Sequence, residues 1–232
     1  QTIRDAAIES AQRFAQRDAR YFGRCLAPRH RWRLLPDFAD RIAYLDIETT
    51  GLGGPADFVT TIALYDGQTV RHYVQGRNLD RFETDVAVYD LVVTYNGGSF
   101  DLPFLRQFLR VDIDAAHLDL MHVLRRIGYA GGLKGVERRL GYDRPDMADI
   151  DGYFAVVLWR EFERTGDERV LETLLAYNVQ DVLTLEPLAA IAFNALVDDT
   201  PFADELRRPV PALAANPFEV HRDIVDRLRH RY

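Results

Sequence analysis

Two acidic residues, Asp46 and Glu48, alternate with the apolar residues Leu45 and Ile47 in the stretch that runs from Tyr44 to Leu52. Side chains alternate between the two faces of a β-strand, so both acids share one face while Leu45 and Ile47 share the other. Two carboxylates about 7 Å apart on one strand face repel each other and lose solvation unless a cation lies between them. A divalent cation with oxygen ligands meets this need. The alternative is an exposed strand end at which a turn begins.

Asp101 is a third acid in an unusual place, at a predicted junction between a strand and a helix. Residues 91–95 form a short apolar run of the kind buried in a sheet interior. Asn96 and two glycines follow, and Ser99 is predicted to cap a helix that runs to about Arg110. Asp101 then lies in the first turn of that helix, where the helix dipole is the ordinary explanation for a lone acid.

Asp181 is the fourth acid, and it lies on a helix that is predicted to be buried. From about Glu168 onward, apolar residues cover most of the helix circumference. Tyr177 precedes Asp181 by four residues and therefore shares its side of the helix. Pro187 is expected to kink or end this helix. An arginine partner is the ordinary explanation for Asp181.

Convergence of the four acids on one point would create strong repulsion unless Mg²⁺ or Mn²⁺ ions neutralise it. Two such ions about 4 Å apart activate water and stabilise the leaving oxygen in phosphodiester hydrolysis. The four acids are therefore interpreted as candidate ligands of two Mg²⁺ or Mn²⁺ ions.

Three blocks of sequence resemble the exonuclease motifs of the DEDD superfamily. They are Tyr44-Leu45-Asp46-Ile47-Glu48-Thr49-Thr50-Gly51, Tyr95-Asn96-Gly97-Gly98-Ser99-Phe100-Asp101-Leu102-Pro103-Phe104-Leu105 and Tyr177-Asn178-Val179-Gln180-Asp181. The third block resembles the tyrosine subclass, because Ala176 stands where the histidine subclass would have its histidine. The second block is similar to that of proofreading domains in family B DNA polymerases. The whole pattern, over about residues 21–197, is most similar to the YprB-like ribonuclease H-like domain family.

The resemblance implies a fold and an activity. The fold would be α/β and ribonuclease H-like, with a five-stranded mixed sheet of order 3-2-1-4-5 and helices on both faces. A predicted hairpin followed by strand and helix alternation is consistent with it. The activity would be metal-dependent 3′–5′ exonuclease hydrolysis, with single-stranded DNA as the expected substrate. A 3′-end-trimming ribonuclease, a structure-selective endonuclease and an inactive nucleic-acid-binding module are the alternatives.

The same resemblance implies roles for individual residues. Asp46 would bridge both metal ions, Glu48 and Asp181 would each help to hold one, and Asp101 would act directly or through water. Tyr177 would orient the attacking water. Residues implied to contact nucleic acid are Thr49, Thr50, Leu52, Asn96 and Phe100, although Leu52 and Phe100 are also typical core residues. Lys134, among glycines that permit close backbone approach, is a candidate phosphate contact or a solvated lysine.

Charge is distributed unevenly along the 232 residues, whose net charge is −7. Residues 1–41 hold nine arginines and five acids, and residues 207–232 hold six arginines and three acids, so residues 42–206 carry −14. An acidic middle between basic ends fits a metal centre approached by nucleic-acid-binding arms, and it also fits ordinary solvated helix faces. Residues 21–40 mix aromatic side chains, Trp32 among them, with Arg24, Arg29, Arg31 and Arg33, which favours pinning to the core over base stacking.

The remaining pattern predicts one domain with extensions. Residues 1–40 are a basic helical extension with a docked helix over 2–20, residues 41–197 the ribonuclease H-like domain, and residues 198–232 a helical extension. Strands at 58–65 and 69–74 are joined by an Asp66-Gly67 two-residue hairpin, a helix covers 78–89, and a strand covers 117–120. The single cysteine, Cys25, has no disulfide or metal-ligand partner. No membrane span or secretory segment is recognised, so a cytoplasmic protein without a membrane partner is expected.

Overall fold

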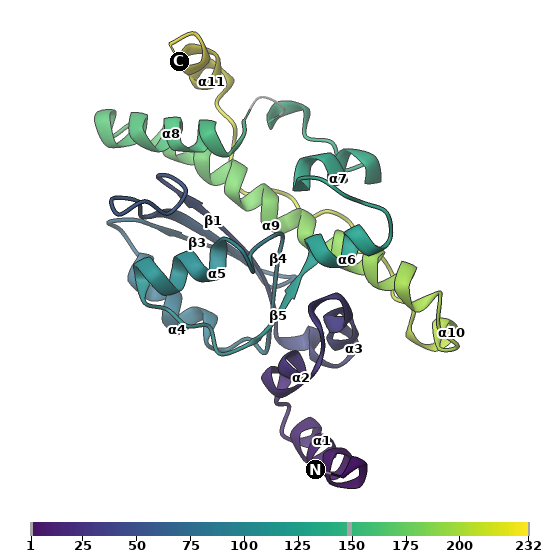
Figure 1. The fold of residues 1–232 in the computed structure, drawn as a ribbon. Coiled ribbons are helices and arrows are strands. Elements are labelled where there is room, and N and C mark those ends of the chain that lie inside the picture. Colours follow the sequence, from purple (N-terminus) through teal and green to yellow (C-terminus); the bar gives the residue numbers. More distant parts are fainter. Residues whose placement is uncertain (1, 148–149, 232) are drawn as a thin grey trace.

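A five-stranded mixed sheet forms the centre of the protein, and helices cover both of its faces (Figure 1). The structure, a computed structural model, describes residues 2–147 and 150–231. The strands are β1 (Ile42–Thr49), β2 (Val59–Tyr65), β3 (Val70–Val74), β4 (Leu91–Thr94) and β5 (Ala116–Asp119), in the order β3-β2-β1-β4-β5. β2 is antiparallel to β1 and β3, and β4 is parallel to β1 and β5. The predicted strand order is confirmed.

The helices of the described residues differ greatly in length. They are α1 (Ile3–Ala15), α2 (Ala19–Cys25), η1 (Pro28–Leu34), α3 (Leu35–Phe38), η2 (Ala39–Arg41), η3 (Leu79–Arg81), α4 (Phe82–Val86), α5 (Asp101–Phe104), η4 (Leu105–Leu109), α6 (Leu120–Arg126), α7 (Leu133–Leu140), η5 (Pro145–Met147), α8 (Gly152–Thr165), α9 (Glu168–Val197), α10 (Ala203–Leu206) and α11 (Arg222–Arg229).

β1 divides the core, because its side chains alternate between the two layers of helices. Leu45 and Ile47 belong to a buried cluster with residues of α4 and α5, such as Phe82. Tyr44 belongs to the opposite cluster, which contains the middle of α9. Asp46 and Glu48 share the face of Tyr44 by the period of two along a strand. The alternation therefore directs both acids toward α9.

α9 is the long helix packed against the sheet, and Asp167 caps its first turn by accepting the Arg169 backbone N–H at 3.0 Å. It runs for 30 residues and continues through Pro187, so of the two predicted effects of the proline, a kink or an end, the end is wrong. Proline removes one backbone donor, but packing of both neighbouring turns holds the helix together. By length and composition α9 could also cross a membrane, yet 78% of its most apolar window is buried inside this structure, as in a core helix.

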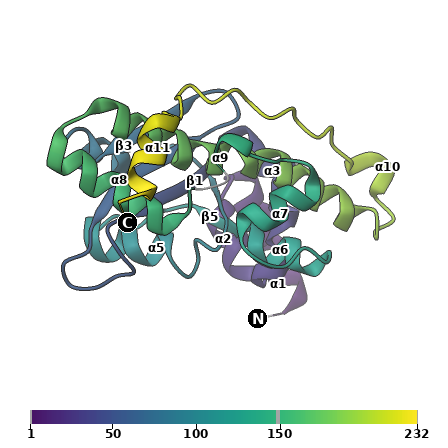
Figure 2. The same ribbon diagram turned by 90° about the horizontal axis from the view of Figure 1, so that it is seen from above.

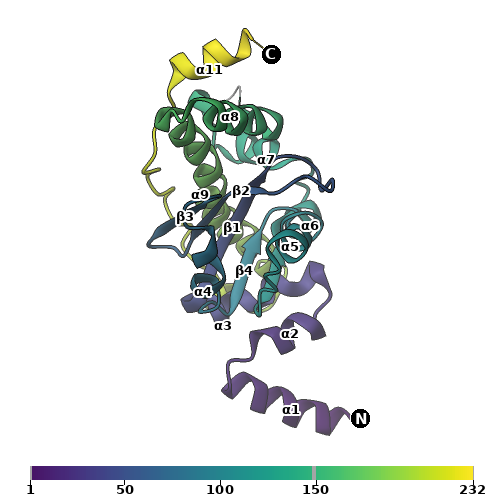
Figure 3. The same ribbon diagram turned by 90° about the vertical axis from the view of Figure 1, so that its left-hand side faces the viewer.

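The N-terminal extension is pinned by its second half and not by its first helix. Trp32 and Phe38 are buried in the cluster that contains Tyr44, which confirms the pinning role predicted for the aromatics. The helix predicted over 2–20 is instead two helices, because Arg17 adopts a left-handed backbone between them. α1 buries none of its side chains and lies away from the sheet (Figure 3), so the predicted docking is limited to its second half. There Phe14 contacts Phe22 and Phe38, and Ser10 and Arg13 contact Tyr21.

Residues 207–221 cross the molecule as an extended segment that leads to α11 (Figure 2), and we call this segment the strap. The strap is tied by side-chain hydrogen bonds, in which the Arg208 guanidinium donates to the Pro36 carbonyl at 2.9 Å and the Asn216 amide donates to the Ala176 carbonyl at 2.8 Å. α11 then buries Ile224 and Val225 against the cluster of α8 and the first half of α9. The C-terminal extension is therefore only partly helical.

Several predicted element boundaries are wrong. The hairpin exists, but residues 66–69 form a four-residue connection in which the Asp66 carboxylate accepts two backbone N–H groups. The helix predicted over 78–89 is the shorter η3 and α4. Ser99 is not a cap, because the helix begins after Phe100, and it gives way to the π-helical turn η4 at Leu105. Tertiary packing decides such ends more than local preference does.

Candidate active site

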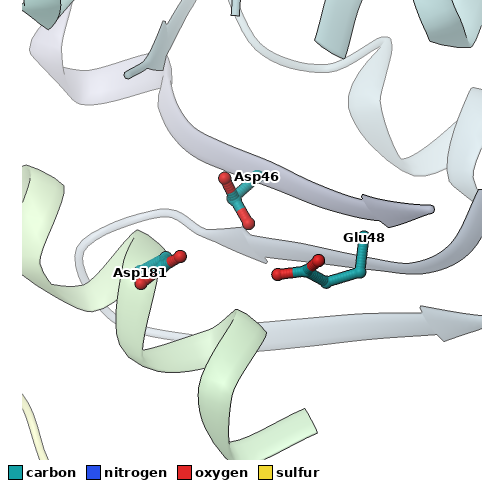
Figure 4. Close-up of side chains that lie close together, drawn as sticks. All are labelled: Asp46, Glu48 and Asp181. Carbon is teal, nitrogen blue, oxygen red and sulfur yellow. The ribbon is translucent and has the colours of Figure 1, made fainter. Parts of the chain in front are cut away.

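Three carboxylates meet in front of β1, as Figure 4 shows. Asp46 and Glu48 come from the strand and Asp181 from α9, and each offers one oxygen within 4.8 Å of the others. Glu48 and Asp181 are buried, and Asp46 is partly buried. Carboxylate oxygens are the ligands that Mg²⁺ and Mn²⁺ prefer, so the donor set and its spacing fit one such ion.

An asparagine orients Asp46. The Asn178 side-chain amide donates to Asp46 Oδ2 at 2.7 Å, and Thr61 of β2 donates its hydroxyl to the Asn178 oxygen at 3.0 Å. Asn178 is fully buried and lies three residues before Asp181, hence on the same side of α9. Asn178 is part of the third sequence motif, but the sequence alone did not assign it a role. The feature that could have indicated one is an amide side chain inside a mainly apolar helix.

Asp101 lies close to this group but outside the set of three oxygens within 4.8 Å. It is the first residue of α5, and its buried carboxylate accepts a hydrogen bond from the Ile47 backbone N–H of β1. The loop before it is held by Asp119, which accepts the backbone N–H groups of Asn96 at 2.8 Å and Gly98 at 3.1 Å. Gly97 is required there, because a Cβ atom would lie 2.3 Å from the Thr94 hydroxyl.

Burial and mutual repulsion raise the pKa of Asp46, Glu48 and Asp101. Burial is the main cause that raises the pKa of Asp46 and of Glu48 well above the usual range, and the charges of Asp181 and Asp101 raise both further. The pKa of Asp101 rises to about 7, again mainly through burial. Perturbed carboxylates gathered in one place indicate a site whose charge an added cation would balance.

Tyr177 lies one helical turn before Asp181 and is buried, as predicted for a shared face. Burial first, and then the charges of Asp181 and Glu48, raises the pKa of its phenol, so the hydroxyl keeps its proton near neutral pH. The ammonium of Lys134, on α7, lies 4.5 Å from the centre of the Tyr177 ring and has no hydrogen-bond partner among the described atoms. Lys134 is thereby placed beside the acids, and its predicted phosphate contact stays a prediction.

Arg144 is a site residue that sequence reasoning did not identify. Its guanidinium forms ion pairs with Asp181 and with the buried Glu137 of α7, and it donates to the Thr184 hydroxyl at 3.3 Å. These partners raise the pKa of Arg144 despite its burial. The ordinary explanation offered for Asp181, an arginine partner, is thus correct, and it holds together with the cluster of acids. No local sequence signal links residues 144 and 181.

The residues implied to contact nucleic acid differ in their exposure and in their hydrogen bonds. Thr49 and Thr50 use their hydroxyls in the turn after β1, where Thr49 donates to the Gly51 carbonyl at 2.6 Å and Thr50 accepts the Phe58 N–H at 3.0 Å. Leu52 is 94% exposed, so the core alternative is wrong for it. Phe100 packs partly on the core against Phe104, and Asn96 has a left-handed backbone.

A model of the RNase H superfamily matches residues 43–192, and the chain therefore belongs to that superfamily. The matched range contains all four acids and Tyr177. The resemblance to the DEDD exonucleases and to YprB-like domains agrees with this assignment.

Among curated proteins, the chain is 31% identical over 170 residues to the uncharacterized protein YprB of Bacillus subtilis (strain 168). The match covers 63% of this chain and 40% of YprB, so the chain spans less than half of that relative. Solved structures of similar fold include a family B DNA polymerase from Pyrobaculum calidifontis (20% identity, 72% of this chain and 27% of that chain, TM-score 0.49). Others are Brucella melitensis NrnC with bound Mg²⁺ (19%, 71% and 78%, 0.48) and the Aedes aegypti Nibbler EXO domain (15%, 72% and 85%, 0.48).

The raised pKa of Asp101 predicts how the stability of the metal-free protein depends on pH. The unfolded chain releases this proton near pH 4, whereas the folded protein keeps it until about pH 7. Between these values the folded state binds more protons, so the Asp101 contribution to stability falls as pH rises. Asp101→Asn cannot ionise, and its free energy of unfolding minus that of the wild type should grow by up to about 4 kcal/mol over this window. Urea unfolding in EDTA at several pH values measures it, and a constant difference would contradict it.

The ion pairs of Arg144 with Asp181 and Glu137 lead us to expect that this residue affects both folding and metal binding. Arg144→Met should destabilise the metal-free protein by about 3–5 kcal/mol, because Asp181 and Glu137 lose their buried partner. The excess negative charge should then make Mn²⁺ raise the melting temperature more in the variant than in the wild type. Arg164→Met, which removes one of the arginine partners of the buried Glu161 elsewhere, is the control and should leave the metal response unchanged. Equal metal responses in Arg144→Met and the wild type would show that Arg144 does not influence the metal site.

Proposed function

We propose that this chain is a metal-dependent 3′–5′ exonuclease that acts on single-stranded nucleic acid, with DNA as the favoured polymer. The observation that supports it best is the group of three carboxylates from β1 and α9, whose oxygens lie within 4.8 Å of one another beside a fourth buried acid. Membership of the RNase H superfamily is consistent with phosphodiester chemistry. The direction of hydrolysis rests on the resemblance of the three motifs to DEDD exonucleases.

The metal ligands follow from the positions of the acids. Asp46, Glu48 and Asp181 would hold one ion, and Asp101 with Asp46 would hold a second, directly or through water. Bound Mg²⁺ or Mn²⁺ would supply an activated water and stabilisation of the leaving oxygen. Asn178 orients Asp46, since its amide donates to one of the two carboxylate oxygens. Arg144 holds Asp181 in place through their ion pair.

Tyr177 and Lys134 would act on the reacting groups. The Tyr177 phenol keeps its proton, so its role is to orient the attacking water by hydrogen bonding and not to remove a proton. The buried Lys134 ammonium lies 4.5 Å from the centre of the Tyr177 ring and lacks a hydrogen-bond partner among the described atoms, so a phosphate oxygen would supply the missing acceptor. Burial lowers the pKa of Lys134, and an added phosphate would offset that cost.

The test uses 5′-labelled single-stranded DNA and RNA of the same sequence with Mg²⁺ or Mn²⁺. A ladder of shortened products on either strand supports the exonuclease, and the polymer that is shortened decides between DNA and RNA. Internal cuts would favour a structure-selective endonuclease. Binding without any metal-dependent release of mononucleotides would favour an inactive nucleic-acid-binding module.

Asp46→Asn should abolish hydrolysis while leaving the protein folded. The substitution removes the proposed shared charge without changing side-chain size, and loss of one ligand should cost several kcal/mol of transition-state stabilisation, roughly a thousandfold or more in rate. The melting temperature without metal should not fall, because one repelling charge is removed. Asp204→Asn on the exposed α10 is the matched control and should keep full activity. Near-normal rates in Asp46→Asn with Mg²⁺ would overturn the proposed metal site.

Tyr177→Phe should lower kcat by about 10- to 1,000-fold with little change in KM, because one positioning interaction is lost. The ring that packs on α9 is kept, so the melting temperature and the response to Mn²⁺ should match those of the wild type. Steady-state kinetics of Tyr177→Phe are compared with those of Asp181→Asn, which should also lose the response of its melting temperature to Mn²⁺. The comparison separates positioning of the water from binding of the metal. Full activity in Tyr177→Phe would make the tyrosine a core residue and leave the carboxylate site standing.

A further inference from the structure

Three exposed arginines surround His30 on the side of the molecule formed by η1 and α6. Arg29 and Arg33 belong to η1, and Arg126 is the last residue of α6. The Arg29 Nε atom lies 3.2 Å from His30 Nε2, and an Arg126 terminal nitrogen lies 3.4 Å from His30 Nδ1. We call Arg29, Arg33 and Arg126 the arginine patch.

The arginine patch lacks the carboxylates that neutralise arginines elsewhere. Within residues 2–147 and 150–231, none of its three members forms an ion pair with an acid. Some exposed arginines on other elements do so, such as Arg77 with Glu168 and Arg169 with Asp223. In a chain of net charge −7, three neighbouring guanidinium groups without an acid are an uncompensated positive surface.

His30 cannot satisfy the arginines that point at it. A guanidinium only donates hydrogen bonds, and a neutral imidazole has one acceptor nitrogen and one donor nitrogen. Burial and the three arginine charges lower the pKa of His30, so the ring is neutral near pH 7. Of the two contacts to its ring nitrogens, at most one is therefore a hydrogen bond. The guanidinium groups keep donor capacity that an anion could use.

Packing of η1 and α6 against the core holds the backbone that carries the arginine patch. Trp32 of η1 is buried and packs edge-on against Phe193 of α9. Arg31, although it lies between two members of the patch in sequence, donates to the backbone carbonyl of His117 at 3.2 Å and has a structural role. Arg126 joins the surface from α6, which packs against η1. Of the arginines that the sequence places together in residues 21–40, only Arg29 and Arg33 thus belong to the arginine patch, which crosses two elements.

The helix that carries Arg126, α6, begins at the end of the parallel strands toward which β1 carries the acids. α6 follows β5, whose last residue Asp119 holds the loop that precedes Asp101. The separation between the acids on β1 and Arg126 at the end of α6 can be estimated from the strand order. It comprises two strand spacings of about 4.8 Å each, from β1 to β5, and the length of the seven-residue α6, about 10 Å. A nucleic-acid strand whose 3′ end lay at the acids would have to be several nucleotides long to reach the arginines.

We propose that the arginine patch binds the phosphate backbone of the nucleic-acid strand upstream of the 3′ end held at the carboxylates. This inference rests on the proposed function and adds to it the surface that holds the substrate. Guanidinium groups recognise phosphate with two parallel hydrogen bonds. Phosphate contacts do not read bases or the 2′-hydroxyl, so the arginine patch serves DNA and RNA alike. Short substrates that do not reach the patch gain nothing from it.

The test compares the triple variant Arg29→Gln, Arg33→Gln, Arg126→Gln with a control of equal charge change. The control is Arg77→Gln, Arg169→Gln, Arg207→Gln, three exposed arginines that already have carboxylate partners. Binding of a labelled single strand of about 15 nucleotides is measured in EDTA over a range of salt concentrations. Hydrolysis plays no part in this measurement, so failure of the proposed exonuclease activity does not affect it.

The patch variant should bind the long strand roughly 10- to 100-fold more weakly at low salt. The slope of the logarithm of affinity against the logarithm of salt should fall in magnitude by about 2, since each lost phosphate contact on a single strand contributes about 0.7. The control should keep a slope close to that of the wild type. An unchanged slope in the patch variant, or an equal loss in the control, would overturn the proposal.

Substrate length gives a second measurement. With Mg²⁺ or Mn²⁺, the patch variant should show a raised KM for the long strand and an unchanged KM and kcat for a dinucleotide. A folding defect would instead reduce activity on both. Equal kinetics of variant and wild type on the long strand would count against the proposal, as would an equal loss on both lengths.

Discussion

Electrostatic repulsion among buried carboxylates is the constraint on which the rest of this structure depends. Asp46, Glu48 and Asp181 each bring an oxygen within 4.8 Å of the others, and Asp101 adds a fourth charge nearby. An apolar core would not tolerate such a group unless other contacts compensated for it. The compensation comes partly from proton uptake, partly from Arg144 and partly from the hydrogen bond of Asn178.

The elements around the acids serve to keep them together despite this repulsion. β1 is the central strand, in which Asp46 and Glu48 are held by pairing with β2, while β4 pairs with the start of the strand, from Ile42 to Tyr44. α9 is buried along most of its length, which fixes the angle at which Asp181 and Tyr177 approach the strand. The energy that assembles the site is therefore hydrophobic burial of strand and helix, which exceeds the local electrostatic cost.

Positive charge is arranged in two ways. Arg144 and Lys134 lie beside the acids and lose solvation there, whereas Arg29, Arg33 and Arg126 stay exposed on η1 and α6. The inner charges act on the carboxylates and on the groups that would react. The outer charges lack acidic partners among the described residues and suit a polyanion. This division explains how a chain of net charge −7 can have a surface suited to nucleic acid.

The resemblance of three sequence motifs was enough to predict the superfamily and the strand order. Local patterns placed Asp46 and Glu48 on one face of a strand and Tyr177 one helical turn from Asp181, because alternation along a strand and spacing along a helix are properties of short segments. Trp32 was also assigned correctly as a core residue from the aromatic content of its segment.

Only the tertiary structure decided which distant residues complete the site. Arg144 reaches Asp181, Thr61 orients Asn178, and Arg126 joins the arginines of η1, although no local pattern connects these positions. Element ends were also decided by packing, as the passage of α9 through Pro187 and the end of α1 at Ala15 show. Local propensities differ by fractions of a kcal/mol per residue, whereas burial of one large side chain is worth about 1.5–3 kcal/mol, so packing prevails where the two disagree.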